Sequence, residues 1–290
     1  ESGETRPRAG RRQGTGAVGG FVADVTTTPT PKFAQPPVVE TVLGVQFAPL
    51  DRFGVPHLGL FWASIRGEYP RQEVQPALDQ EMDAPPRPQA IRLTLTNQPE
   101  VRCWFLDSDG GQLIQVQRDR FIRNWRRVPG NDAYPSYDVL KPRFERDWAQ
   151  FHDFLAREEL GRPDVNLCEA TYVNHLAEGE GWSSFGHIHD VLSIIAPPER
   201  HFLPEPEIAT LNMRYLMPDK LGRLHVTLQP AVRQGDAKPV LQLTLIARGR
   251  PASSRTEDLL AWFDIGHEWI VRGFAEVTTE AMHRLWGRYR

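Results

Sequence analysis

Two long amphipathic segments constrain the fold of this chain most strongly. Residues 136–158 and 256–277 carry apolar side chains at helical spacing along their whole length. Each segment follows a run of short stretches that are rich in β-branched residues, which favour strands. The apolar stripe of the first segment consists of Leu140, Phe144, Trp148, Phe151 and Leu155, and that of the second consists of Leu260, Phe263, His267, Ile270 and Phe274.

The order of the expected elements occurs twice. The first half predicts a strand at 38–50, a short helix at 56–69, strands at 90–97, 101–107 and 112–127, and the first long helix. The second half predicts a strand at 163–176, a short helix at 183–195, strands at 208–218, 221–233 and 238–250, and the second long helix. Corresponding elements lie about 120 residues apart, which indicates an internal repeat.

These patterns predict an α+β fold that arose by tandem duplication of one unit. The unit is a strand, a short helix, antiparallel strands and a long helix, and the long helices cover one face of the sheets. We expect the first repeat at 36–160 and the second at 161–290. Residues 1–35 are rich in Gly, Arg, Thr and Pro and have no apolar period, so we predict a disordered tail and linker there.

The charge balance excludes attraction to partners through bulk charge. The chain has 34 basic and 37 acidic side chains, a net charge of −3, so we expect no nucleic-acid partner. No apolar run approaches the ~20 residues of a membrane span, so we expect no membrane partner. Cys103 and Cys168 lie in apolar stretches without a CxxC spacing, which predicts reduced, buried thiols and a cytoplasmic location.

A histidine lies in the middle of the second apolar stripe. His267 is flanked by Trp262 and Trp269 in "AWFDIGHEWIVRGF". A histidine on an apolar helix face is usually a hydrogen-bonded core residue, so we predict that His267 packs in the core. A role as a catalytic acid or base is the alternative.

The stretch "GHIHD" brings His187, His189 and Asp190 close together in the sequence. The surrounding residues favour a helix, and side chains two residues apart do not face each other on an α-helix. We therefore expect ordinary surface and packing roles and predict no bound metal ion and no cofactor. A metal or ligand site, or catalysis by these three residues, is the alternative.

The stretch "RDRFIRNWRR" interleaves five arginines with Phe121 and Trp125. As an amphipathic strand it would have a solvated, charged face, and arginine and tryptophan are enriched at binding hot spots. The sequence thus predicts a partner-binding surface here, consisting of Arg118, Arg120, Arg123, Trp125 and Arg126.

Three stretches carry a family resemblance: "PPVVETVLGVQF", "LIQVQRDRFIRNWR" and "FDIGHEWIVRGFAEVTTEAMHRLWGR". On these, the chain resembles an uncharacterised, sporadically distributed bacterial protein family, over essentially all of Pro36 to Arg288. The resemblance implies no particular activity. The patchy distribution that it implies is typical of accessory, defence or toxin–antitoxin genes.

Together these observations predict a non-enzymatic protein-binding module. It would act on a partner encoded nearby, as an antitoxin-like or immunity-like protein or a defence accessory protein. The alternative is a small-ligand-binding or metal-binding protein, or an enzyme, with a pocket between the sheet and a long helix. In that alternative, His187, His189, Asp190 or His267 would supply the chemistry.

Overall fold

The fold is described by a computed structural model, which covers residues 29–81, 100–130, 133–197, 199, 201–233 and 237–290. The expected strand at 90–97 and most of the expected tail, residues 1–28, lie outside the described residues.

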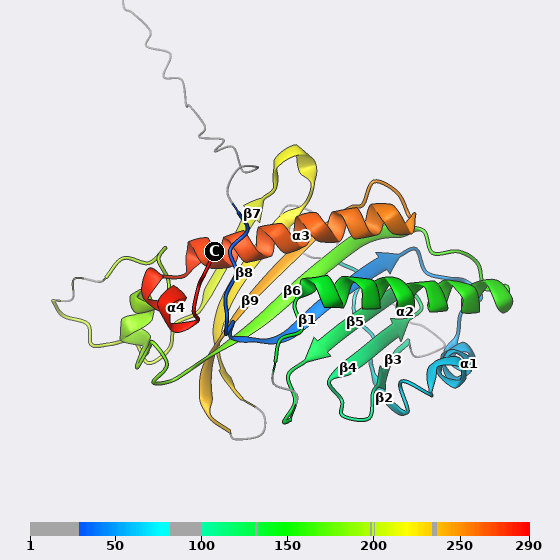
Figure 1. The fold of residues 1–290 in the computed structure, drawn as a ribbon, viewed down its shortest axis with the longest axis horizontal. Helices are drawn as coiled ribbons and strands as arrows, with labels where there is room; N and C mark the ends of the chain where they lie inside the picture. Colours follow the sequence, from blue (N-terminus) through cyan, green and yellow to red (C-terminus); the bar gives the residue numbers. More distant parts are fainter. Residues whose placement is uncertain (1–28, 82–99, 131–132, 198, 200, 234–236) are drawn as a thin grey trace, which may run out of the picture.

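The described strands form one antiparallel sheet of nine strands, in the order β2-β3-β4-β5-β1-β6-β9-β8-β7 (Figure 1). Reading outward from the central β1–β6 pair gives β5, β4, β3 and β2 on one side and β9, β8 and β7 on the other. The mixed α+β class is therefore confirmed. The strands are β1 (Val38–Phe47), β2 (Arg71–Pro76), β3 (Val101–Leu106), β4 (Gln112–Gln117), β5 (Arg120–Arg126), β6 (Val165–Ala177), β7 (Leu211–Leu216), β8 (Arg223–Val232) and β9 (Pro239–Gly249).

Figure 1 shows the two long helices, α2 and α3, on the same face of the sheet. They contact each other through a stacked pair of rings, Tyr137 and His267, and through the salt bridge from Lys141 to Asp264. The helical elements are α1 (Val55–Ile65), α2 (Tyr137–Arg157), α3 (Thr256–Val277), α4 (Glu280–Leu285) and two short 3₁₀ segments, η1 (Phe185–Asp190) and η2 (Pro218–Lys220).

Aromatic side chains fill the space between α2 and the sheet. All five residues of the predicted stripe on α2 are buried. The Phe121 ring on β5 lies 5.3 Å from Trp148 and 5.2 Å from Phe151, measured between ring centroids. On α3, Gly273 leaves room for Leu224 of β8, because a Cβ there would lie 2.6 Å from the leucine side chain. The apolar stripes therefore hold the helices against the sheet, as their periodicity predicts.

The segment 112–127, expected as one strand, is a hairpin of β4 and β5. Gln117 pairs with Arg120, so the chain turns at Arg118 and Asp119. This turn has no Asn-Gly or Asp-Gly sequence, the usual signal for a two-residue hairpin loop. The turn places β5 between β4 and β1 in the interior of the sheet, where both of its faces are covered.

Residues 78–81 cover part of the sheet face that points away from α2. The side chain of Gln117 accepts a hydrogen bond from the Leu78 amide at 2.8 Å and donates one to the Leu78 carbonyl at 2.9 Å. The Arg120 guanidinium donates to the Asp79 carbonyl at 2.6 Å. These bonds to backbone groups satisfy polar side chains that the fold buries.

The end of the expected linker has a defined place in the fold. Residues 32–35 pair with the C-terminal residues 286–290 through backbone hydrogen bonds. The Phe33 ring packs edge-on against Phe274 of α3 at 5.5 Å and lies 6.2 Å from Trp286. The region 29–35 therefore differs from the predicted disordered linker, because Phe33 finds an apolar site made by the other end of the chain.

A buried ion pair joins β5 to α2. Arg123 Nε donates to Asp147 Oδ2 at 2.8 Å, and their side chains are 3% and 0% exposed. The Tyr69 hydroxyl donates to the same oxygen at 2.8 Å, and Arg146 donates to Asp147 Oδ1. The carboxylate is thus fully hydrogen-bonded, which the burial of a charge requires.

We expect Arg123→Met to reduce the free energy of unfolding by about 3–5 kcal/mol, because it leaves the Asp147 charge buried without this partner. The double variant Arg123→Met/Asp147→Leu should lose less than the single variant, since it removes both charges. Urea unfolding followed by circular dichroism measures each value. The control is Arg118→Met, whose side chain is 40% exposed and pairs with the exposed Asp51, and it should cost less than about 1 kcal/mol. Equal losses at both arginines would contradict the prediction.

Candidate functional site

The long connection between β6 and β7, residues 178–210, brings together the features that best indicate a site. We call it the β6–β7 loop. It contains η1 and projects from the end of the molecule at the left of Figure 1. Two cavities, a cluster of metal-ligating side chains and several exposed apolar side chains all lie on it.

The base of the β6–β7 loop is fixed to the body of the protein. The Trp182 indole N–H donates to the Leu176 carbonyl at 3.0 Å, and Leu192 is fully buried and forms a bridge with Thr278. The Thr279 hydroxyl donates to the Asp190 carbonyl at 2.6 Å. The junction of α3 and α4 therefore holds the backbone of η1 in place.

His187, His189 and Asp190 form a cluster at the end of η1. One possible ligand atom from each residue lies within 4.8 Å of the other two, and among the described residues no other group of three shares this property. His187 Nδ1 is 3.3 Å from Asp190 Oδ2, and His189 Nε2 is 3.6 Å from Asp190 Oδ1. The expectation that these side chains do not face each other is therefore wrong.

The backbone of η1 explains why they meet. The expected α-helix at 183–195 is a 3₁₀ segment over Phe185–Asp190, and in a 3₁₀ helix residues three apart are eclipsed. His187 and Asp190 are three residues apart, and their side chains lie 3.3 Å from each other. The backbone of His187 itself departs from helical geometry, with φ −109° and ψ 21°. The argument from α-helical spacing thus does not apply to this segment.

Glu205, from the far end of the β6–β7 loop, approaches the same cluster. Its Oε1 is 3.6 Å from His187 Nε2, and its Oε2 accepts a hydrogen bond from the Ser184 hydroxyl at 2.7 Å. The side chain crosses over Gly186, where an added Cβ would lie 2.6 Å from the Glu205 carboxyl carbon. Sequence reasoning missed Glu205, because 15 or more residues separate it from the histidines and no spacing rule joins them.

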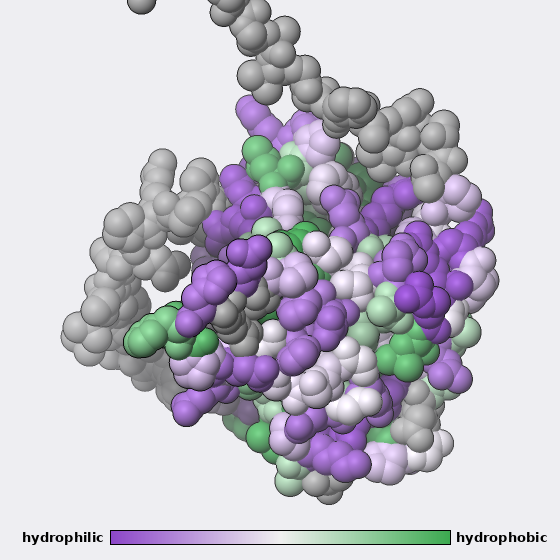
Figure 2. All heavy atoms as spheres, turned by 90° about the vertical axis from the view of Figure 1, so that its left-hand side faces the viewer, coloured by the Kyte–Doolittle hydropathy of each residue, from purple (hydrophilic) through white to green (hydrophobic). Residues whose placement is uncertain are grey.

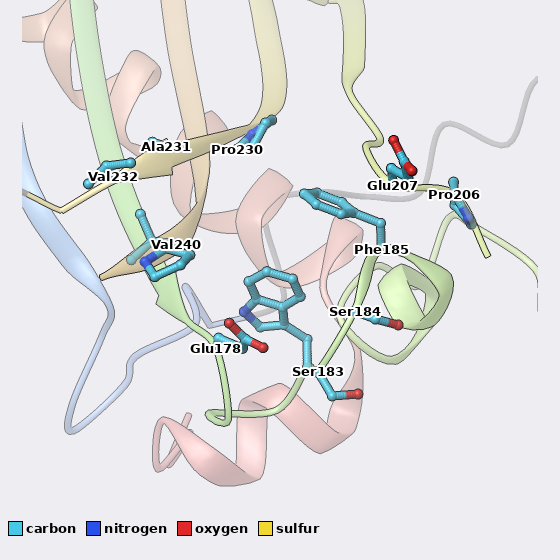
Figure 3. Close-up of a pocket in the computed structure, with 12 residues that line it drawn as sticks. Glu178, Ser183, Ser184, Phe185, Pro206, Glu207, Pro230, Ala231, Val232 and Val240 are labelled. Carbon is cyan, nitrogen blue, oxygen red and sulfur yellow. The ribbon is translucent and has the colours of Figure 1, made fainter. Parts of the chain in front are cut away.

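Two cavities flank the loop. The first, of about 540 Å³, lies between Trp182 to Phe185 of the loop and the ends of β8 and β9. Figure 3 shows Phe185 and Glu178 reaching into the space beside Pro230 and Val240. The second, of about 680 Å³, is lined by His189 and Glu205 as well as by apolar residues of the loop. Both cavities lie on the β6–β7 loop, unlike the expected pocket between the sheet and a long helix.

Large apolar side chains of the loop face solvent. Phe202 is 93% exposed, Leu203 is 72% exposed and Ile208 is 62% exposed. Figure 2 views this end of the molecule and shows separate apolar areas within a largely hydrophilic surface. Sequence reasoning also missed these residues, although an apolar pair between the charges and prolines of "PERHFLPEPE" is a visible signal.

His267 packs between the long helices and the sheet. Its ring stacks on Tyr137 with centroids 4.0 Å apart, and its Nδ1 lies 2.8 Å from the Tyr172 hydroxyl on β6. Burial lowers the pKa of His267 to about 4, against the opposing effect of the Asp138 and Asp264 carboxylates. The ring is therefore neutral at pH 7, and its contacts agree with the predicted packing role.

Three of the five predicted partner-binding residues lie inside the protein. Arg120, Arg123 and Trp125 are 8%, 3% and 1% exposed, because β5 is an interior strand. Arg118 and Arg126 are only partly exposed. The predicted strand with a solvated charged face is thus wrong, and these five side chains do not form one surface.

Comparisons with known proteins place no further constraint on the site. No protein-family model matches this chain, and neither a curated protein nor a solved structure matches it. The resemblance to the sporadically distributed family remains a prediction from the sequence. In the part of the chain that the structure describes, no helix has both the length and the apolar character that crossing a bilayer requires.

The low pKa of His267 predicts a pH dependence of stability. Between pH 6.5 and about 4 the unfolded state binds a proton at this residue and the folded state does not, so stability falls as the pH falls. The loss should reach roughly 3 kcal/mol. Urea unfolding at pH 7 and pH 4 measures it, and a His267→Gln variant should lack this part of the difference. The same pH dependence in both proteins would refute the prediction.

Proposed function

We propose that this chain is a non-enzymatic protein-binding module and that the β6–β7 loop is its contact surface. The observation that carries the proposal is the exposure of Phe202, Leu203 and Ile208 on one projecting loop. Covering a phenylalanine or leucine side chain contributes about 1.5–3 kcal/mol. Phenylalanine is also among the residue types enriched at protein interfaces.

The proposal assigns the binding role to a different surface from the one that the sequence indicates. The arginines and tryptophan of β5 have partners within the fold, and Arg123 is held by Asp147. A partner can reach the buried Arg120, Arg123 and Trp125 only if the sheet opens. The β6–β7 loop has a fixed base and an exposed tip, so a partner can bind it without unfolding the sheet.

The family resemblance adds an expectation about the partner. A sporadically distributed protein that binds another protein fits an antitoxin-like, immunity-like or defence accessory role, with its partner encoded nearby. The proposal includes a cytoplasmic location, supported by the buried free thiols of Cys103 and Cys168.

We also infer that the fold arose by tandem duplication of residues 36–160 and 161–290. The order of strands outward from the central pair supports this inference, because β1, β5, β4 and β3 occupy the same positions as β6, β9, β8 and β7. Each set is followed in the chain by a long helix, α2 or α3. The central β1–β6 pair would then be the junction between the two copies.

Small-ligand binding is the second candidate function, and the cavity of about 540 Å³ favours it. Its volume falls within the range of small-molecule sites, and Phe185 and Glu178 supply an aromatic ring and a carboxylate. Retention of a stoichiometric small molecule by the purified protein, detected by native mass spectrometry, would support this candidate over a purely protein-binding role.

The double variant Phe202→Ser/Leu203→Ser tests the proposed function. We expect it to weaken partner binding by at least about tenfold, because covering two large apolar side chains contributes more than 1.4 kcal/mol. The partner is first recovered by affinity purification from the native cell. Calorimetry with both purified proteins then gives the dissociation constant.

A matched control is Val55→Ser/Leu60→Ser on α1, at the opposite end of the molecule in Figure 1. These two side chains are also exposed, so the control removes similar apolar surface elsewhere. It should bind the partner as the wild-type chain does. A loop variant with an unchanged dissociation constant would exclude the β6–β7 loop as the contact surface.

A further inference from the structure

The cluster at the end of η1 has the composition and geometry of a metal site. It combines two imidazoles and a carboxylate, from His187, His189 and Asp190. We propose that these three residues bind one divalent metal ion of the zinc class, with Glu205 as an outer carboxylate. The inference is independent of the proposed protein binding and departs from the expectation of no metal ion.

The distances between the side chains suit a small ion. Zinc lies about 2.0–2.1 Å from imidazole nitrogens, so two ligands of a tetrahedral ion are about 3.3–3.5 Å apart. His187 Nδ1 and Asp190 Oδ2 are 3.3 Å apart, and His189 Nε2 and Asp190 Oδ1 are 3.6 Å apart. Both histidine–aspartate pairs therefore have nearly the required spacing, each to a different oxygen of Asp190, and the three donors lie within 4.8 Å of one another.

Glu205 and Ser184 supply a second layer around the histidines. When His187 binds the ion through Nδ1, its Nε2 carries the proton, and that nitrogen faces Glu205 Oε1 at 3.6 Å. Metal-binding histidines characteristically donate their other N–H to a carboxylate, which fixes the tautomer and the ring orientation. The Ser184 hydroxyl holds the second oxygen of Glu205 at 2.7 Å.

The backbone holds the ligands in place before any ion arrives. The Asp190 carbonyl accepts a hydrogen bond from the Thr279 hydroxyl, and the neighbouring Val191 and Leu192 are fully buried. His189 Nδ1 is buried and makes no hydrogen bond with the described residues, so Nε2, which faces Asp190, is the nitrogen that can bind the ion. The backbone at the cluster is therefore already in place, and an ion has only the side chains to order.

The donor set selects the class of ion. Two imidazoles and one carboxylate favour Zn²⁺, Co²⁺ or Ni²⁺ over Mg²⁺ and Ca²⁺, which prefer oxygen ligands alone. Three protein ligands leave one position of a tetrahedral ion open. The His187 and Asp190 side chains are 49% and 51% exposed, so solvent can fill that position.

Calorimetric titration of the untagged full-length chain with ZnCl₂, after removal of metals with EDTA, tests the proposal. We expect one ion per chain and a rise of the thermal unfolding midpoint in its presence. The variant His187→Ala/His189→Ala should show no saturable binding over the range that saturates the wild-type chain. Glu205→Gln should bind about tenfold more weakly, as expected for an outer carboxylate.

His175→Ala, which removes a half-buried histidine from β6, is the matched control and should bind zinc as the wild-type chain does.

Should the double variant fail to fold, Asp190→Asn removes a ligand with little change in shape, and it should lose the visible absorption of bound Co²⁺. Equal zinc binding by the wild-type chain and the folded ligand variant would overturn the proposal, as would the absence of binding to the wild-type chain. Loss of zinc binding with partner binding retained would leave the proposed protein-binding function standing.

Discussion

The antiparallel pairing of β1 with β6 is the interaction on which the rest of the structure depends. It runs from Val38 opposite Asn174 to Phe47 opposite Val165, and it joins the two halves of the chain into one sheet. Without it, both strands would be edges with unpaired backbone groups. With it, the strands at the centre of the sheet are hydrogen-bonded on both sides, and α2 and α3 can contact each other across the junction.

The continuous sheet determines which charged side chains are buried and which parts of the chain are exposed. It makes β5 an interior strand, so Arg123 requires the Asp147 carboxylate from α2. The proposed contact surface and the proposed metal site both lie where the chain leaves the sheet. The β6–β7 loop is such a place, because the junction of α3 and α4 fixes its base while Phe202 and Leu203 extend into solvent.

Features that depend on local chemistry could be predicted from the sequence. The apolar stripes at 136–158 and 256–277 locate α2 and α3 closely. The hairpin at Arg118 and Asp119 was not predictable in the same way, since its turn lacks the residues that favour positive φ. The sequence identifies His187, His189 and Asp190 as candidate site residues but predicts neither their mutual approach nor the position of Glu205.

By itself, the sequence determined the periodicity of the helices and strands. It also determined the apolar stretches around Cys103 and Cys168, because both features follow from each segment's own residues. Only the tertiary structure decided that the arginines of β5 are buried, since burial depends on which strands lie on either side. It also decided that Glu205 lies beside His187, because loop closure brings together residues that no spacing rule connects. Patterns within a segment determine its helix or strand, whereas contacts between distant segments determine which side chains are buried and which come together.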